Sequence, residues 1–225
     1  FKGEFVVFDL ETTGFSALVD RVIEIGAVKI KNNEIVDRFS TFVNPQIPIS
    51  FRIENLTGIN DQMVMNAPRI EEILPKFLEF CEDAVMVAHN AEFDTSFIIN
   101  KAEKIGINVN TTIIDTVLLA QFLMPNLHNY KLDTLTKHLN VVLESHHRAV
   151  DDAAATADIF VKMIKMLYDR DIPDVDKLNE EGKMDENAIK KLHQYHCIIL
   201  ASNEMGRINL YRLVSASHLQ YFNRF

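Results

Sequence analysis

The chain has 225 residues, of which 48% are hydrophobic and 24% charged, as in an ordinary globular protein of one good-sized domain with an attachment. Its net charge of −9 argues against broad non-specific wrapping of nucleic acid, but allows a small nucleic-acid site in which metal ions supply positive charge. No apolar run approaches the roughly 20 residues of a membrane span and no secretory signal opens the chain, so we expect a cytoplasmic protein without a membrane partner.

The N-terminal part predicts strands. The apolar-rich segments 4–10, 21–30 and 34–43 are separated by turn-prone residues, and the last two form a predicted hairpin across Lys31-Asn32-Asn33. Pro45 and Pro48 then predict a loop that continues through Leu56 to Ile59.

Helices and short strands alternate after this loop. Apolar spacing predicts helices over 70–80, 92–103, 116–123, 131–139 and 149–168, with short strands over 84–88 and 113–115. A hairpin followed by such alternation indicates a mixed α/β sheet flanked by helices.

The composition changes near Asp171. Residues 171–194 are acidic and poor in large apolar side chains, which predicts a linker with at most a short helix. Beyond it we expect a strand over 195–202 and a helix over 206–215. The predicted domain boundaries are therefore 1–170, 171–194 and 195–225.

Two cysteines, Cys81 and Cys197, are far apart and lack metal-ligand spacing, which predicts reduced thiols rather than a disulfide or a zinc site. The chain begins with Phe1 rather than Met, so we expect it to be part of a longer polypeptide.

The stretch "VVFDLETTG" places two carboxylates at the end of a predicted buried strand. Asp9 and Glu11 share one face of that strand, because side chains alternate between its two faces. Two like charges held close together in a buried place favour protonation or a cation between them, and carboxylate oxygens suit Mg²⁺ or Mn²⁺. The alternative is that both carboxylates cap the next turn.

The stretch "AHNAEFD" follows another predicted buried strand. Asn90 is a predicted N-cap and Asp94 lies in the first turn of the next helix. Taken alone, Asp94 is more simply explained as a complement to the helix dipole. A strand-to-helix junction is, however, also where sites of α/β proteins form.

The stretch "SHHRAVDDAAATAD" offers two histidines and two aspartates. On a helical projection at about 100° per residue, Asp151 begins a polar stripe that continues through Ala155 and Asp158 and that we expect to face solvent. Asp152 lies on a mostly apolar stripe and needs a partner, so it is the functional candidate. The pattern leaves open whether His146 or His147 acts with it.

Together, "FDLETTG", "HNAEFD" and "HRAVDDA" resemble the three motifs of the DnaQ-like, DEDDh-type 3′→5′ exonucleases, in the same order. The resemblance covers roughly residues 4–170 and implies a ribonuclease H-like mixed sheet, with antiparallel hairpin strands plus parallel strands, flanked by helices. The histidine of that family precedes the last aspartate by five residues, which selects His147 with Asp152.

The resemblance also implies the residue roles. Two divalent cations, Mg²⁺ or Mn²⁺, would be bound by the family's four carboxylates, and His147 would be the general base that takes a proton from the attacking water. The substrate would be the 3′ end of a single-stranded or frayed DNA strand. The implied metal ligands are Asp9, Glu11, Asp94 and Asp152, and the implied substrate-binding residues are Thr12, Thr13, Gly14, His89 and Asn90.

The tail, "YHCIILASNEMGRINLYRLVSASHLQYF", resembles part of the polymerase-and-histidinol-phosphatase (PHP) domain of bacterial replicative polymerases. An exonuclease followed by this tail is similar to PolC-type DNA polymerase III alpha chains. That similarity implies a proofreading exonuclease whose partner is the remainder of the polymerase chain, including the rest of the PHP domain. We assign no metal site to His196.

Two alternatives stay open. The same motifs would serve an exoribonuclease or oligoribonuclease, because sugar selectivity depends on pocket shape, although the PHP-like tail favours DNA. The domain would also be compatible with a catalytically dead module that binds a polymerase or a DNA end, although all five site residues are present. The sequence lacks the P-loop, dinucleotide-binding, zincin and nucleophile-elbow motifs.

Overall fold

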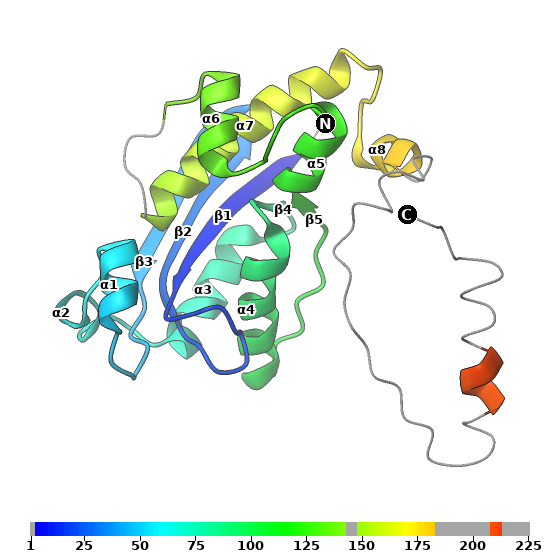
Figure 1. Ribbon diagram of the computed structural model, residues 1–225. Coiled ribbons are helices and arrows are strands. Elements are labelled where there is room, and N and C mark those ends of the chain that lie inside the picture. Colours follow the sequence, from blue (N-terminus) through cyan, green and yellow to red (C-terminus); the bar gives the residue numbers. More distant parts are fainter. Residues whose placement is uncertain (1–2, 143–147, 183–207, 213–225) are drawn as a thin grey trace. The chain divides into compact units, whose positions relative to one another are not determined.

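The computed structural model describes residues 3–142, 148–182 and 208–212 (Figure 1). The chain divides into two compact units, Phe1–Met184 and Asp185–Phe225. In the second unit, residues 208–212 are helical, within the helix predicted over 206–215. The strand predicted over 195–202 lies outside the described residues.

The first unit is built on a five-stranded mixed sheet in the order β3-β2-β1-β4-β5, which confirms the predicted fold class. The central strand β1 pairs antiparallel with β2 and parallel with β4, so the hairpin and the later strands join at β1. The strands are β1 (Glu4–Thr12), β2 (Val22–Lys31), β3 (Glu34–Phe42), β4 (Val85–Ala88) and β5 (Ile113–Asp115).

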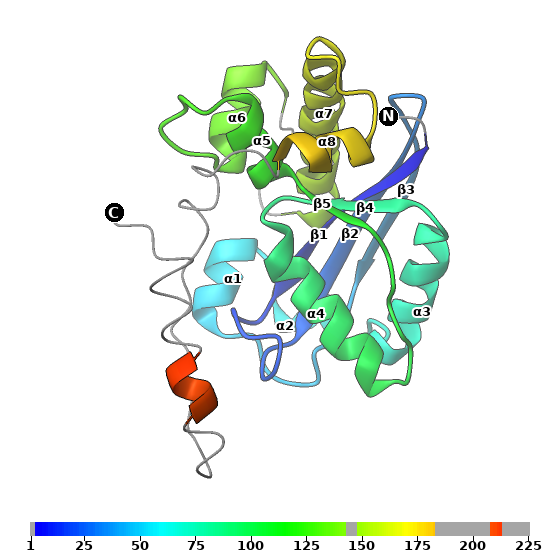
Figure 2. The same cartoon turned by 90° about the vertical axis from the view of Figure 1, so that its right-hand side faces the viewer.

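Helices cover both faces of this sheet, as Figure 2 shows. One face packs against α3 (Ile70–Cys81) and α4 (Ala91–Lys104). The other packs against α5 (Thr116–Leu123), α6 (Leu132–Leu139) and α7 (Ala149–Tyr168). The helix α8 (Val175–Gly182) follows within the stretch expected to be a linker. Across the described part of the chain, no helix is long and apolar enough to cross a membrane.

Two short helices follow β3. The first lies inside the segment that was predicted to be a loop, so that prediction was wrong there, and the second follows that segment. They are α1 (Phe51–Thr57) and α2 (Asp61–Val64). The Ser50 and Asn60 side chains accept hydrogen bonds from the first turns of α1 and α2, at 3.4 and 3.2 Å. Such caps start helices too short to show clear apolar periodicity.

Alternation along β1 decides which side chains face which helices. Phe5 and Val7 lie in the core under α5 to α7, whereas Val6 and Phe8 lie in the core under α3 and α4. The odd-numbered side chains that follow on β1 therefore continue on the α7 side of the sheet.

A glycine allows the start of α7 to lie directly on β2. A Cβ atom on Gly26 would fall 2.0 Å from the Val150 nitrogen and 2.1 Å from the Ala149 carbonyl carbon. Gly26 pairs with Asp9 in the sheet, so the first turn of α7 is brought next to the end of β1.

We predict that Gly26→Ala lowers the free energy of unfolding by about 1–3 kcal/mol or more, because backbone atoms would have to move to admit the methyl group. Chemical denaturation of the purified chain would measure this loss. Ser40→Ala is the matched control, since Ser40 pairs with Gly26 from β3 but is exposed. Equal stability of the Gly26 variant and the wild type would contradict the close packing.

Candidate active site

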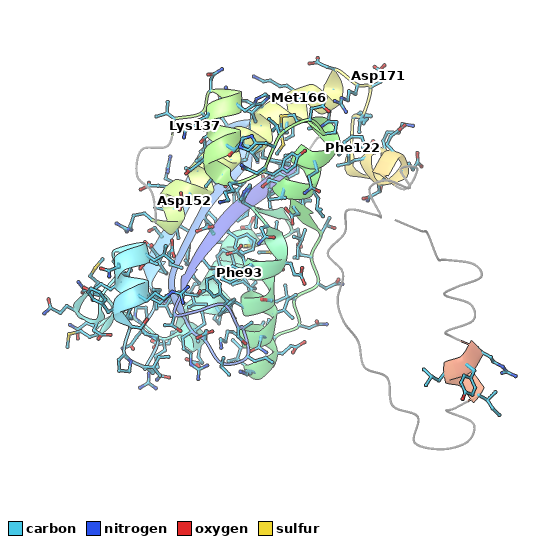
Figure 3. The ribbon with its side chains drawn as sticks, in the orientation of Figure 1. Phe93, Phe122, Lys137, Asp152, Met166 and Asp171 are labelled. Atoms are coloured by element: carbon cyan, nitrogen blue, oxygen red, sulfur yellow. The ribbon has the colours of Figure 1, made fainter. Side chains whose placement is uncertain are left out.

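Three carboxylates from the end of β1 and the start of α7 come together. Each of Asp9, Glu11 and Asp152 offers an oxygen, and these oxygens all lie within 4.8 Å of one another. Figure 3 labels Asp152 on the first part of α7. Asp152 lies more than 140 residues after Asp9 and Glu11 in the sequence, and the close approach at Gly26 makes the meeting possible.

Asp94 reaches the same region from the other layer of helices. It lies in the first turn of α4, its side chain is buried, and its Oδ1 accepts a hydrogen bond from the Leu10 backbone N–H at 3.1 Å. Asp94 is thus held against β1 between Asp9 and Glu11, beside the three clustered carboxylates rather than within that group.

The electrostatics of the cluster oppose full ionisation. Burial, and then the negative charge of Asp94 and of the neighbouring carboxylates, raise the pKa of Asp9 well above its usual value. Burial, and then the charges of Asp152 and Glu24, raise the pKa of Glu11 to about 7. Burial raises the pKa of Asp94 to about 8, despite the backbone hydrogen bonds that it accepts.

An all-oxygen donor set of three closely spaced carboxylates fits a hard divalent cation such as Mg²⁺ or Mn²⁺. A cation between the carboxylates would remove their mutual repulsion and replace the protons that burial otherwise favours. Asp9, Glu11 and Asp152 are the residues placed to hold it.

Helix α7 distinguishes its two neighbouring aspartates. Asp152 belongs to the cluster, and the residues that follow on its stripe, Thr156 and Ile159, are buried. Asp151 is outside the cluster. The polar stripe predicted from Asp151 is interrupted, because Ala155 is only 3% exposed and belongs to the buried side of the helix. His146 and His147 lie outside the described residues.

The loop after β1 is held by its own side chains. Thr12 is buried and its hydroxyl donates to the Gly14 carbonyl at 2.7 Å. The Thr13 hydroxyl accepts from the Arg21 backbone N–H at 2.9 Å. A Cβ on Gly14 would fall 2.6 Å from the carboxylate of Asp20, so a side chain at that position would displace Asp20.

The second motif is held by β5 and α5. The Nδ1 atom of the half-buried His89 lies 2.9 Å from the Thr116 hydroxyl, and burial lowers the pKa of His89. Asn90 stands at the N-cap position, but in a left-handed conformation and without a side-chain cap bond. Asp115 instead accepts hydrogen bonds from the backbone N–H groups of Asn90 and Ala91, at 3.2 and 3.1 Å.

Sequence reasoning missed two residues next to the cluster. Glu24 is fully buried on β2, opposite Glu11, and Arg148 donates to it from Nε and Nη2 at 3.0 and 2.9 Å. The available signal was a glutamate between apolar residues near the start of β2, on the same face as the cluster, since a buried charge needs a partner.

Comparison with known proteins places the chain in a family. Residues 6–160 match the exonuclease family RNase_T. The "DNA polymerase III PolC-type" of Caldanaerobacter subterraneus subsp. tengcongensis is 55% identical over 99% of this chain, and that of Bacillus subtilis is 44% identical over 98%. The chain spans only 16% and 15% of those relatives.

Solved structures share the fold. Exonuclease X, in complex with 5′ overhanging duplex DNA, is 27% identical, with a TM-score of 0.59 over 72% of this chain and 91% of that one. The nuclease domain of 3′hExo, a DEDDh family member bound to rAMP, has a TM-score of 0.64 over 73% of this chain and 93% of that one. At 19% identity the second likeness supports the fold alone, and it agrees with the predicted ribonuclease H-like sheet.

The family match covers well over half of the chain, and the curated relatives align along nearly all of it. The carboxylate cluster lies within the matched residues, at the junction of β1 and α7. The chain therefore belongs to the exonuclease family and carries an exonuclease domain of the kind found in PolC-type DNA polymerase III.

Proposed function

We propose that this chain is a proofreading 3′→5′ exonuclease that hydrolyses the terminal phosphodiester of single-stranded or frayed DNA and releases nucleoside 5′-monophosphates with the help of two divalent cations. The observation that carries the proposal is the meeting of Asp9, Glu11 and Asp152, with Asp94 beside them, within an exonuclease fold. The polymerase relatives support DNA as the substrate.

In the proposed mechanism, Asp9, Glu11 and Asp152 would hold the cations at the end of β1, and Asp94 would support the site from α4. Divalent cations, when bound, acidify the attacking water and neutralise the charge that develops on the phosphate. His147 takes the proton from that water as general base.

The proposed substrate contacts surround this cluster. Thr12, Thr13 and Gly14 would line the terminal nucleotide, supported by the loop that Asp20 braces. His89 and Asn90 would approach the strand from the start of α4. Phe15 is 73% exposed, with its ring 6.3 Å from that of Phe93, and an exposed ring there would stack on a terminal base.

We further propose that residues 1–170 form the exonuclease domain, 171–194 a linker and 195–225 part of a PHP domain. The partner would then be the remainder of a PolC-type polymerase chain in the bacterial cytoplasm, because the relatives that align along this chain are polymerases of which it spans a small part. Proofreading selectivity would come from melting, since a mismatched end frays more readily into the site.

We expect the purified chain to shorten 5′-labelled single-stranded DNA one nucleotide at a time from its 3′ end when Mn²⁺ or Mg²⁺ is present. Gel analysis would follow the ladder, and chelation of the cations should stop it. RNA of matched sequence is the control substrate. No digestion of either strand would contradict the enzyme proposal, and faster digestion of RNA would favour an exoribonuclease.

We predict that Asp152→Asn lowers kcat on DNA by more than about 100-fold. Mutation of residues that only support metal ligands already lowers metal affinity or activity by about 10–100-fold, and Asp152 would itself be a ligand. Asp151→Asn is the matched control, one position away on the same helix and outside the cluster, and should stay close to wild type. The reverse order of effects would show that the wrong face of α7 had been assigned.

The cluster also predicts a pH-dependent response to metal. In the folded state the pKa values of Glu11 and Asp94 are raised to about 7 and 8. Without cations, the folded chain therefore loses stability as the pH rises from the ordinary carboxyl pKa to these raised values, because the buried groups must then lose their protons. Mn²⁺ should therefore raise Tm more at about pH 8 than at about pH 5.5, as measured by calorimetry.

The control for the metal response is the double variant Asp9→Asn with Glu11→Gln, which removes two ligands. Its Tm should depend little on Mn²⁺ at either pH. If Mn²⁺ raised the Tm of the wild type as much at about pH 5.5 as at about pH 8, or still raised the Tm of the double variant, the metal would bind elsewhere.

A further inference from the structure

An ion pair between a buried carboxylate on β2 and a partly exposed arginine ties the start of α7 to the sheet. Glu24 on β2 is fully buried, and the guanidinium of Arg148 donates two hydrogen bonds to its Oε1 atom, from Nε at 3.0 Å and Nη2 at 2.9 Å. The Ala149 backbone N–H donates to the other oxygen, Oε2, at 3.2 Å. Both oxygens of one carboxylate are thus engaged by consecutive residues at the entrance to the helix.

Arg148 is fixed from a second side as well. Its guanidinium carbon lies 5.2 Å from the centre of the Phe42 ring, at the end of β3. The charged fork and the aromatic ring together restrict a side chain that is otherwise 41% exposed. Arg148 therefore has a defined position relative to β2 and β3, although it precedes the helix.

The same residue controls the backbone of the helix's first turn. The carbonyl of Arg148 accepts hydrogen bonds from the N–H groups of Asp151 and Asp152, at 2.9 and 3.0 Å. Glu24 itself pairs with Glu11 across the β1–β2 ladder. A short path of bonded contacts thus runs from the strand beside Glu11, through Arg148, to the backbone of Asp152.

We propose that Glu24 is a positioning residue of the exonuclease, which acts through Arg148 and the Ala149 amide to place Asp152 against Asp9 and Glu11. This inference rests on the proposed function and adds a cause for the geometry of its site.

The variants Glu24→Gln and Arg148→Met test this role. The first keeps the shape and an oxygen for the Ala149 amide but removes the charge; the second leaves a buried carboxylate without its partner and should lower Tm more. Arg148→Lys keeps the charge but loses the pair of hydrogen bonds from the guanidinium, so its activity should lie between those of Arg148→Met and the wild type. Glu82→Gln is the control, because it removes the charge of the exposed Glu82, which pairs with Lys29 on β2, the strand that also carries Glu24.

We expect Glu24→Gln and Arg148→Met each to lower kcat on single-stranded DNA by about 10–100-fold with little change in KM, and to weaken Mn²⁺ binding measured by titration calorimetry on the 225-residue chain. The double variant should be no worse than the poorer single variant, because both changes break the same contact. Glu82→Gln should behave as wild type.

Wild-type kcat and Mn²⁺ affinity in Glu24→Gln would overturn the proposal, as would fully additive effects in the double variant. An equal loss in Glu82→Gln would show general destabilisation instead. The two proposals fail separately: a wild-type chain without nuclease activity contradicts the proposed function, while the Mn²⁺ affinities of the variants still decide whether Glu24 positions the cluster.

Discussion

The mutual repulsion of carboxylates held at the end of β1 is the constraint on which the site depends. Asp9, Glu11 and Asp152 share a small volume, and their partial burial limits how far water screens their charges. The fold stabilises this arrangement through its core, and the carboxylates oppose it. A cation is the natural counterpart, because it converts the repulsion into three favourable contacts.

Three features of the fold produce this arrangement. Strand alternation puts Asp9 and Glu11 on one face of the sheet. The missing side chain at Gly26 lets α7 approach the backbone of β2 on that same face. The pairing of Glu24 with Arg148 then sets where the helix begins. Each of these features bears on the distance between the carboxylates.

Local patterns in the sequence predicted much of this structure. The helices over 116–123 and 149–168 have the predicted bounds, since apolar spacing is strong there. The helical period separated Asp152 from Asp151, and Asp152 lies in the carboxylate cluster. The functional role of Asp152 stays a prediction. The helices α1 and α2 were missed because capping side chains, rather than periodicity, start them.

Local sequence patterns could not predict the contacts between distant segments. Glu24 and Arg148 are 124 positions apart, and no local period relates them. The close approach at Gly26 likewise depends on how α7 crosses β2, which the strand's own sequence does not reveal. Ala155 was placed on the wrong side for a related reason, because α7 is covered more widely than a single apolar stripe predicts.

The most direct test of the central claim is a crystal structure of the chain grown with Mn²⁺, with anomalous diffraction recorded near the manganese edge. We predict anomalous density within coordination distance of oxygens from Asp9, Glu11 and Asp152. Fully formed carboxylates without anomalous density between them, or manganese bound only elsewhere, would contradict the claim.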